Sequence, residues 1–266
     1  MFLAIEKFSD EYLTSAQAAN AWPIEYPWPL DALHCNTRLW EYPFAVRSVR
    51  DYVLPRGRIL DIGSALTFFP MFLAAEGFQV VASDYDPRMV PWFRRIAERA
   101  PIRLWPRDRL CYERLDVTVL DVAENSFDAV TNISVLEHLP MIALERAAAS
   151  IHRVLKPGGI FVCTLDCWIG GARTPEHHPL DQAEFANFFR VLRNYFEEAE
   201  AREVRTPCDF ITNVQFPRDL ARAGDATVCP ESLARRIRRA IRTVVRGDYP
   251  SRLNWCVYGI VLRKRG

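Results

Sequence analysis

The sequence lacks the features that would place it in several large classes of protein. Its longest apolar run, WCVYGIVL, is far too short to cross a bilayer, and its first residues, MFLAIEKFSDEYL, have neither the basic segment nor the sustained apolar run of a secretory signal. Acidic and basic side chains are almost balanced, at 33 and 34, so a surface field of one sign is excluded as well. We therefore expect a cytoplasmic globular protein without a membrane span.

The cysteines carry no signal for a disulfide framework or a metal centre. They are seven, an odd number, and none stands in a CxxC pair. Cys163 and Cys167 are four residues apart, but no second pair follows at the spacing of a zinc site. We expect reduced thiols and no metal, in a chain long enough to form a core without cross-links.

What the sequence does have is an alternation of apolar strand candidates with segments of helical length. The strands are expected within residues 57–63, 78–84, 112–119, 127–134, 159–166 and 254–265. The helices are expected within residues 70–76, 87–99, 144–159 and 182–196. Such alternation predicts an α/β fold of the doubly wound kind, in which a mostly parallel sheet carries helices on both faces.

Residues 1–50 differ from the rest and are expected to form an N-terminal extension, partly helical and partly extended, that serves as a lid. The prolines of WPIEYPWPLD exclude a regular helix in that stretch. Residues 51–266 are expected to form the main domain, with a helical, basic insertion at about 207–250 before the last strand.

Glycine is scarce where the first strand of the sheet ends, in the stretch ILDIGSALTFFP. Gly63 is present, but Ala65 and Thr67 stand where a glycine-rich nucleotide loop has further glycines. Those glycines let the backbone approach a pyrophosphate, so their absence disfavours a dinucleotide. A cofactor without phosphate, such as S-adenosylmethionine, requires less of the loop. Asp84, 21 residues beyond Gly63, is spaced to accept hydrogen bonds from ribose hydroxyls.

At these residues the chain resembles the class I S-adenosylmethionine-dependent methyltransferases. Asp61 and Gly63 match the family's first motif, a strand ending in D-x-G-x-G-x-G, and Asp84 matches its acid on the second strand. Asp116 lies eleven residues before Phe127, as the family's acid for adenine precedes its next strand, and ISVLEHLP and HRVLKPGGIFV continue the match. The resemblance covers roughly residues 55–165. It implies a Rossmann-like sheet of seven strands, S-adenosylmethionine as cofactor and S-adenosylhomocysteine as product.

The resemblance also implies a role for each matching position. Gly63, Ser64 and Ala65 are expected to carry the methionine part of the cofactor, with Asp61 acting on its ammonium group. The other expected contacts follow in chain order: Asp84 for the ribose, Tyr85 for one face of the adenine, Asp116 and Val117 for the adenine edge, and Asn132 beside the sulfonium.

Methyl transfer to a hydroxyl acceptor requires a place for the acceptor's proton, and histidine titrates in the most suitable pH range. The candidates are His177 and His178, in the loop after the fifth strand, and His138, after the fourth. A mechanism that relies on proximity alone, without a base, stays open.

The sequence favours a small acceptor. The stretch NISV at 132–135 differs from the N-P-P-Y type associated with methylation of planar nitrogens, which favours a hydroxyl of a sugar or a secondary metabolite. The chain also resembles a methyltransferase subgroup associated with bacterial surface glycans and natural products, which fits a glycan, and the arginines of SLARRIRRAIRTVVRG are compatible with a small anionic acceptor. Arg38, Trp40, Glu41 and Tyr42 stand just before the first strand; Trp40 and Tyr42 are expected to pack the extension onto the sheet, with contact to the acceptor as the alternative.

Two other functions stay open. The missing loop glycines are compatible with a catalytically silent module that binds S-adenosylmethionine or a partner. The arginines of SLARRIRRAIRTVVRG are compatible with an RNA methyltransferase, although the balanced charge and the absence of interleaved aromatics disfavour nucleic acid. The sequence leaves the oligomeric state undetermined.

Overall fold

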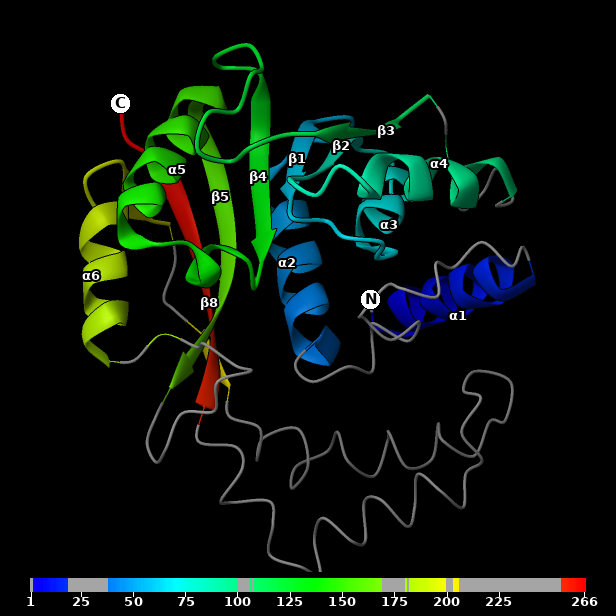
Figure 1. Ribbon diagram of the computed structural model, residues 1–266, viewed down its shortest axis with the longest axis horizontal. Helices are drawn as coiled ribbons and strands as arrows, with labels where there is room; N and C mark the ends of the chain where they lie inside the picture. The colour runs from blue at the N-terminus through cyan, green and yellow to red at the C-terminus, as the bar shows by residue number, and fades with distance from the viewer. Residues whose placement is uncertain are drawn as a thin grey trace, which may run out of the picture.

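The computed structural model describes residues 2–18, 38–99, 106, 108–168, 180, 182–199, 203–205 and 255–266 (Figure 1). Its helices are α1 (Phe2–Ala18), α2 (Arg38–Tyr52), α3 (Phe69–Ala75), α4 (Met89–Arg99), α5 (Met141–Val154) and α6 (Gln182–Leu192), with a short 3₁₀ turn, η1 (Leu136–His138). Its strands are β1 (Arg58–Ile62), β2 (Gln79–Asp84), β3 (Leu110–Arg114), β4 (Phe127–Ile133), β5 (Leu155–Trp168), β6 (Phe196–Glu198), β7 (Glu203–Arg205) and β8 (Trp255–Lys264). The basic insertion expected at 207–250 lies outside the described residues.

The strands form one sheet in the order β3-β2-β1-β4-β5-β8-β6, and β7 also pairs with β8. β1 to β5 run parallel, whereas β8 is antiparallel to β5, β6 and β7. The predicted α/β, Rossmann-like, mostly parallel sheet is therefore confirmed. The seventh position of the sheet is shared by two short strands that the sequence pattern does not reveal, β6 opposite one end of β8 and β7 opposite its middle.

Helices cover both faces of the sheet, as the alternation of strands and helices predicts. In β2, Val80 and Ala82 belong to the core formed with α1, α2, α3 and α4, while Val81 belongs to the core formed with α5 and α6. This follows from the strand geometry, because successive side chains point to opposite faces. Figure 1 shows α5 and α6 on one side of β4 and β5 and α2 on the other.

α2 packs on the sheet at very short range, although it begins within the predicted N-terminal extension. A Cβ atom on Gly259 of β8 would lie 2.6 Å from the Trp40 ring and 2.8 Å from the Phe44 ring. Those two rings stack with their centroids 5.0 Å apart, and Val49 is fully buried. Trp40 therefore packs the extension onto the sheet, as expected, and it can do so because Gly259 has no side chain in the way of the helix.

β3 ends earlier than the predicted strand at 112–119. The chain turns after Arg114 because the carbonyl oxygen of Asp116 accepts hydrogen bonds from the backbone N–H groups of Val119 and Leu120, at 3.0 and 2.8 Å. This turn brings Asp116 to the carboxyl end of the sheet.

Among the described helices, none is long and apolar enough to cross a membrane.

Candidate functional site

A cavity of about 470 Å³ lies at the carboxyl ends of β1, β2 and β4, the edge at which open parallel sheets bind their ligands. Its volume is in the range of small-molecule pockets. Nine of the predicted site residues line it: Asp61, Gly63, Ser64, Ala65, Asp84, Tyr85, Asp116, Val117 and His138. Segments that are distant in the sequence therefore converge on one space.

The loop after β1 adopts the left-handed backbone that its glycine motif is suited to. Gly63 has φ 68° and Ala65 has φ 47°. A Cβ atom on Gly63 would lie 2.5 Å from Cγ2 of Val135, so glycine is required there for both conformation and space. Ala65 adopts a similar conformation with a side chain, which costs roughly 1–2 kcal/mol for an L-residue.

Three side-chain hydroxyls stabilise this loop, which lacks the further glycines of the family motif. They donate to three successive carbonyl oxygens: Thr67 to Ser64 at 3.0 Å, Tyr112 to Ala65 at 2.8 Å and Tyr12 to Leu66 at 2.7 Å. The donors come from the loop itself, from β3 and from α1. Thr67, which departs from the family motif, thus stabilises the turn that it occupies.

Asp61 lies beneath the loop and is 2% exposed. Its Oδ1 accepts a hydrogen bond from Thr131 at 2.7 Å and its Oδ2 accepts one from Ser64 at 2.5 Å. Burial raises the pKa of Asp61 to about 6, while the hydrogen bonds from Ser64 and Thr131 act in the opposite direction. Both carboxylate oxygens therefore already support the loop, and any action on a ligand ammonium group uses their remaining lone pairs.

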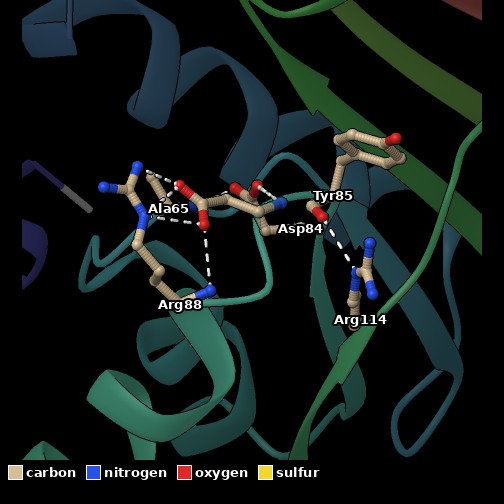
Figure 2. A network of polar contacts seen from close by, with 6 residues as sticks. Ala65, Asp84, Tyr85, Arg88 and Arg114 are labelled. Atoms are coloured by element: carbon tan, nitrogen blue, oxygen red, sulfur yellow. Dashed lines mark hydrogen bonds and ion pairs between the residues drawn. The ribbon is translucent and has the colours of Figure 1, made fainter.

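Asp84 stands at the end of β2 with its carboxylate turned to the loop (Figure 2). Oδ2 accepts the backbone N–H of Ala65 at 3.1 Å, and Oδ1 accepts the N–H of Asp86 at 3.0 Å. Burial raises the pKa of Asp84, and the two N–H donors oppose that shift. The residue expected to hold a ribose thus also fixes the loop expected to hold the methionine part.

Tyr85, the next residue, remains 65% exposed at the rim of the cavity. The guanidinium carbon of Arg114 lies 5.7 Å from the centre of its ring, and Arg114 Nε donates to its carbonyl oxygen at 3.2 Å (Figure 2). A large exposed aromatic ring beside a cavity suits stacking on a planar ligand.

Asp116 is exposed at the same end of the cavity, next to the buried Val117. Its Oδ1 accepts hydrogen bonds from the backbone N–H and the hydroxyl of Thr118, at 2.8 and 2.7 Å. Asp116 therefore shapes its own turn as well as lining the cavity.

Asn132 does not line the cavity. It is fully buried, its Oδ1 accepts the N–H of Leu136 at 3.3 Å and the Cys163 thiol at 3.7 Å, and its Nδ2 lies 3.5 Å from the carbonyl oxygen of Ile62. At the end of β4 the cavity is lined instead by Ile133 and Ser134. The sequence analysis missed Ser134, whose φ of 51° turns the chain after the strand.

Of the three histidines predicted as a base, the structure describes His138 alone. His138 lines the cavity from η1. His177 and His178 lie outside the described residues, so their role as base stays a prediction. Within the part of the chain that the structure describes, no group of three or more His, Cys, Asp or Glu side chains is arranged to hold a metal ion.

Arg38 and Tyr42 of α2 also line the cavity, and Arg38 reaches Ser134 at the end of β4, which β1 separates from β2 and Asp84. Burial raises the pKa of Tyr42 to about 12, although the charge of Arg38 and a hydrogen bond with Thr67 lower it. The alternative noted for Tyr42, contact with a ligand, therefore has support in its position. The signal in the sequence was a charged and an aromatic residue four apart in the extension, just before the first strand.

Comparison with known proteins agrees with this geometry. Residues 60–163 match the family described as methyltransferase domain. Over this central stretch the chain is similar to the S-adenosylmethionine-dependent methyltransferases. A ubiquinone biosynthesis O-methyltransferase of Xanthomonas campestris pv. campestris is 36% identical over 133 residues, which cover 46% of this chain and 51% of that one. The S-adenosyl-L-methionine-dependent Diels-Alderase iccD of Talaromyces variabilis is 34% identical over 110 residues, covering 41% and 36%.

Among solved structures, the [4+2]-cyclase SpnF has a similar fold, with a TM-score of 0.59 at 22% identity over 95% of this chain and 92% of that one. The chain spans about half or less of the length of the curated relatives named above. These methyltransferases use S-adenosylmethionine, and the cavity fits that cofactor in chemistry, because its carboxylates suit the ribose hydroxyls and the adenine amino group.

Proposed function

We propose that this chain binds S-adenosylmethionine in the cavity and transfers its methyl group to a hydroxyl of a small acceptor. The convergence of Asp61, Asp84 and Asp116 on one cavity carries the proposal. The cofactor supplies an already activated methyl group, so the protein provides position and a destination for the acceptor's proton. The similarity to a relative named as an O-methyltransferase supports oxygen as the acceptor atom.

The polar residues at the two ends of the cavity suggest how the ligands are arranged. Asp84 and Asp116 are proposed to bind the adenosine part, and Tyr85 to cover the adenine. Arg38 and Ser134, at the other end, then face the acceptor. A guanidinium there suits an acceptor with an anionic group, and a sugar or a secondary metabolite of that kind is our proposal. The cytoplasmic location stays a prediction.

Calorimetric titration with S-adenosylhomocysteine tests the cofactor site. We expect binding by the wild type and a loss of about 1.5–3 kcal/mol of binding free energy in Asp84→Ala, as for hydrogen bonds to a charged group. Asp86→Asn is the matched control, because Asp86 lies two residues away and pairs with Arg88 outside the cavity lining. Absence of binding by the wild type at millimolar ligand would refute the proposal.

A second candidate is a protein that binds S-adenosylmethionine without transferring its methyl group. Two observations favour it: the strained Ala65 at a motif glycine position, and the similarity to a relative named as a Diels-Alderase. The two candidates differ in product. Incubation with S-adenosylmethionine and a panel of hydroxylated acceptors yields S-adenosylhomocysteine only if the methyl group is transferred.

The RNA methyltransferase alternative depends on the arginine-rich segment, which lies outside the described residues, and stays a prediction.

A further inference from the structure

Three carboxyl side chains from three elements lie together behind the wall of the cavity. They are Glu41 of α2, Glu137 of η1 and Asp166 of β5, and we call them the acid cluster. The backbone N–H of Asp166 donates to Oε1 of Glu137 at 3.1 Å. The charge of Glu41 acts on both other carboxyls. No step of the proposed reaction uses these residues so far.

One hydroxyl connects the acid cluster to the cavity. Ser134, which lines the cavity, donates from Oγ to Oε1 of Glu41 at 2.6 Å. Thr164 donates to the same oxygen, also at 2.6 Å. Arg38, the other cavity-lining member of this network, pairs with Oε2 of Glu41 and donates to Oγ of Ser134 at 3.1 Å. A proton that reaches Ser134 from the cavity is thus one hydrogen bond from a carboxylate.

The acid cluster has spare capacity to accept hydrogen bonds. Glu41 is fully buried and Glu137 is 5% exposed. Within the described part of the chain, Oε2 of Glu137 and Oδ1 of Asp166 are enclosed without a hydrogen-bond partner. Buried carboxylate oxygens are rarely left so, because an unsatisfied acceptor in the interior is unfavourable. A protonated carboxyl has less need of donors, and it brings one of its own.

Charge leads to the same conclusion. Among the described residues, the guanidinium of Arg38 is the positive charge that acts on Asp166, and the neighbouring Cys163 thiol, whose pKa burial raises, is uncharged. Burial and the charge of Glu41 raise the pKa of Asp166 to about 7, against a lowering effect of Arg38. Burial and the charge of Asp166 likewise raise the pKa of Glu137. The acid cluster therefore exchanges a proton near neutral pH.

Resting on the proposed function, we propose that the acid cluster accepts the proton that methyl transfer releases, and that Ser134 conducts this proton from the acceptor. In the step, a bond forms between the acceptor oxygen and the methyl carbon. The bond between that carbon and sulfur breaks, and its electron pair stays on sulfur. The acceptor's hydroxyl proton passes to Ser134 Oγ, and the hydroxyl proton of Ser134 passes to Glu41, whose charge acts on the other two carboxyls of the acid cluster.

The charge of the cofactor determines when the acid cluster takes up the proton. S-adenosylmethionine carries a positive sulfonium, which favours the ionised carboxyls and so lowers the proton affinity of the acid cluster. S-adenosylhomocysteine is neutral at sulfur, so the proton affinity rises at the moment when the acceptor gives up its proton. The positive charge is in effect transferred from sulfur to the acid cluster as a proton.

Proton linkage in ligand binding tests this without an acceptor. Calorimetric titrations at pH 6.5, in two buffers of different ionisation enthalpy, give the number of protons released. At this pH the ligands' α-amino groups, with an ordinary pKa of about 7.7–8.0, stay protonated and contribute little. We expect S-adenosylmethionine to release on the order of half a proton per site more than S-adenosylhomocysteine, because any proton that the common ammonium group displaces from Asp61 is the same for both ligands.

Isosteric variants assign the released proton to the acid cluster. In Glu137→Gln and Asp166→Asn the difference between the two ligands should shrink to less than half, whereas Asp128→Asn should keep it. Asp128 is the matched control because its carboxylate pairs with Lys156 and accepts the N–H of Arg58, outside the acid cluster and the cavity lining. A difference that persists in both cluster variants overturns the proposal.

The wild type alone provides a second measurement, should a cluster variant fail to fold. The affinity ratio of S-adenosylmethionine to S-adenosylhomocysteine should rise about three- to tenfold between pH 6 and pH 7, because deprotonation of the acid cluster favours the cation. A ratio independent of pH, or equal proton release by the two ligands, overturns the inference while leaving the cofactor site intact. Failure of both ligands to bind refutes the proposed function instead.

Discussion

The hydroxyl of Tyr12 lies 2.7 Å from the carbonyl oxygen of Leu66, a residue 54 positions along the chain. This hydrogen bond joins α1 to the loop that forms one wall of the cavity. The ring of Phe8, one turn before Tyr12, packs edge-on against Phe72 of α3, with centroids 5.4 Å apart. The N-terminal helix therefore supports the loop from behind, in addition to any part it plays as a lid.

Tyr12→Phe should destabilise the fold by about 1–3 kcal/mol, because it leaves the buried carbonyl oxygen of Leu66 without its donor. The affinity for S-adenosylhomocysteine should fall as well, since the loop loses one of its supports. Urea unfolding and calorimetric titration measure the two effects. Tyr52→Phe is the matched control and should change neither, as Tyr52 does not line the cavity.

Ala65→Gly should not destabilise the protein, in contrast to most alanine-to-glycine changes. At φ 47° the left-handed strain of roughly 1–2 kcal/mol that glycine relieves is offset in part by the greater entropy of glycine in the unfolded chain. We expect a change between zero and about 1 kcal/mol in favour of the variant. Ala149→Gly, within α5, should instead cost about 1 kcal/mol. Equal losses in the two variants would show that Ala65 is not strained.

Gly63→Ala should destabilise by about 1–3 kcal/mol, because the new methyl group meets Val135 and the φ of 68° disfavours a side chain. Shortening the neighbour, in Gly63→Ala/Val135→Ala, should restore part of the loss. The two effects are therefore expected to be non-additive, which a double-mutant cycle by urea unfolding measures. Strict additivity would exclude the steric contact as the cause.

The sequence predicts the sheet well, and it predicts which residues after β1, β2 and β3 line the cavity, because both depend on local patterns. Buried strands such as 58–62 and 127–133 are short apolar runs, and the acids at their ends come in the order of a known motif. β6 and β7 are three residues each, which leaves no periodicity to detect. Their pairing depends on β8, more than fifty residues further along the chain.

The acceptor end is less predictable, since it is made by contacts across the fold. Nothing local in NISV indicates that Asn132 turns into the sheet and that Ser134 faces the cavity. The orientation follows from the partners of Asn132, the Leu136 N–H and the Cys163 thiol, which only the assembled sheet brings near. Likewise Glu41 and Thr164 are 123 residues apart, and their contact becomes visible only once α2 is docked on β5.

Asp61 should make the stability of the protein depend on pH in a definite window. Its pKa is raised to about 6 in the fold, against an ordinary value of about 3.9, so between these values the folded chain binds more protons than the unfolded chain. The free energy of unfolding therefore decreases as the pH rises from about 4 to about 6. Below this window the protonated carboxyl is buried without charge, and above it the ionised carboxylate is held in the interior at a cost.

Asp61→Asn removes that titration. The free energy of unfolding of the variant minus that of the wild type should rise by about 2–3 kcal/mol as the pH increases from 4 to 6.5. The changed hydrogen bonds to Ser64 and Thr131 add a constant to this difference and do not affect its rise. Urea unfolding at several pH values measures this difference. Asp86→Asn is a control of opposite sign, because the hydrogen bond from Arg88 lowers the pKa of Asp86 and its charge stabilises the fold as the pH rises. A flat difference between Asp61→Asn and the wild type would mean that Asp61 stays ionised throughout, with Ser64 and Thr131 outweighing its burial.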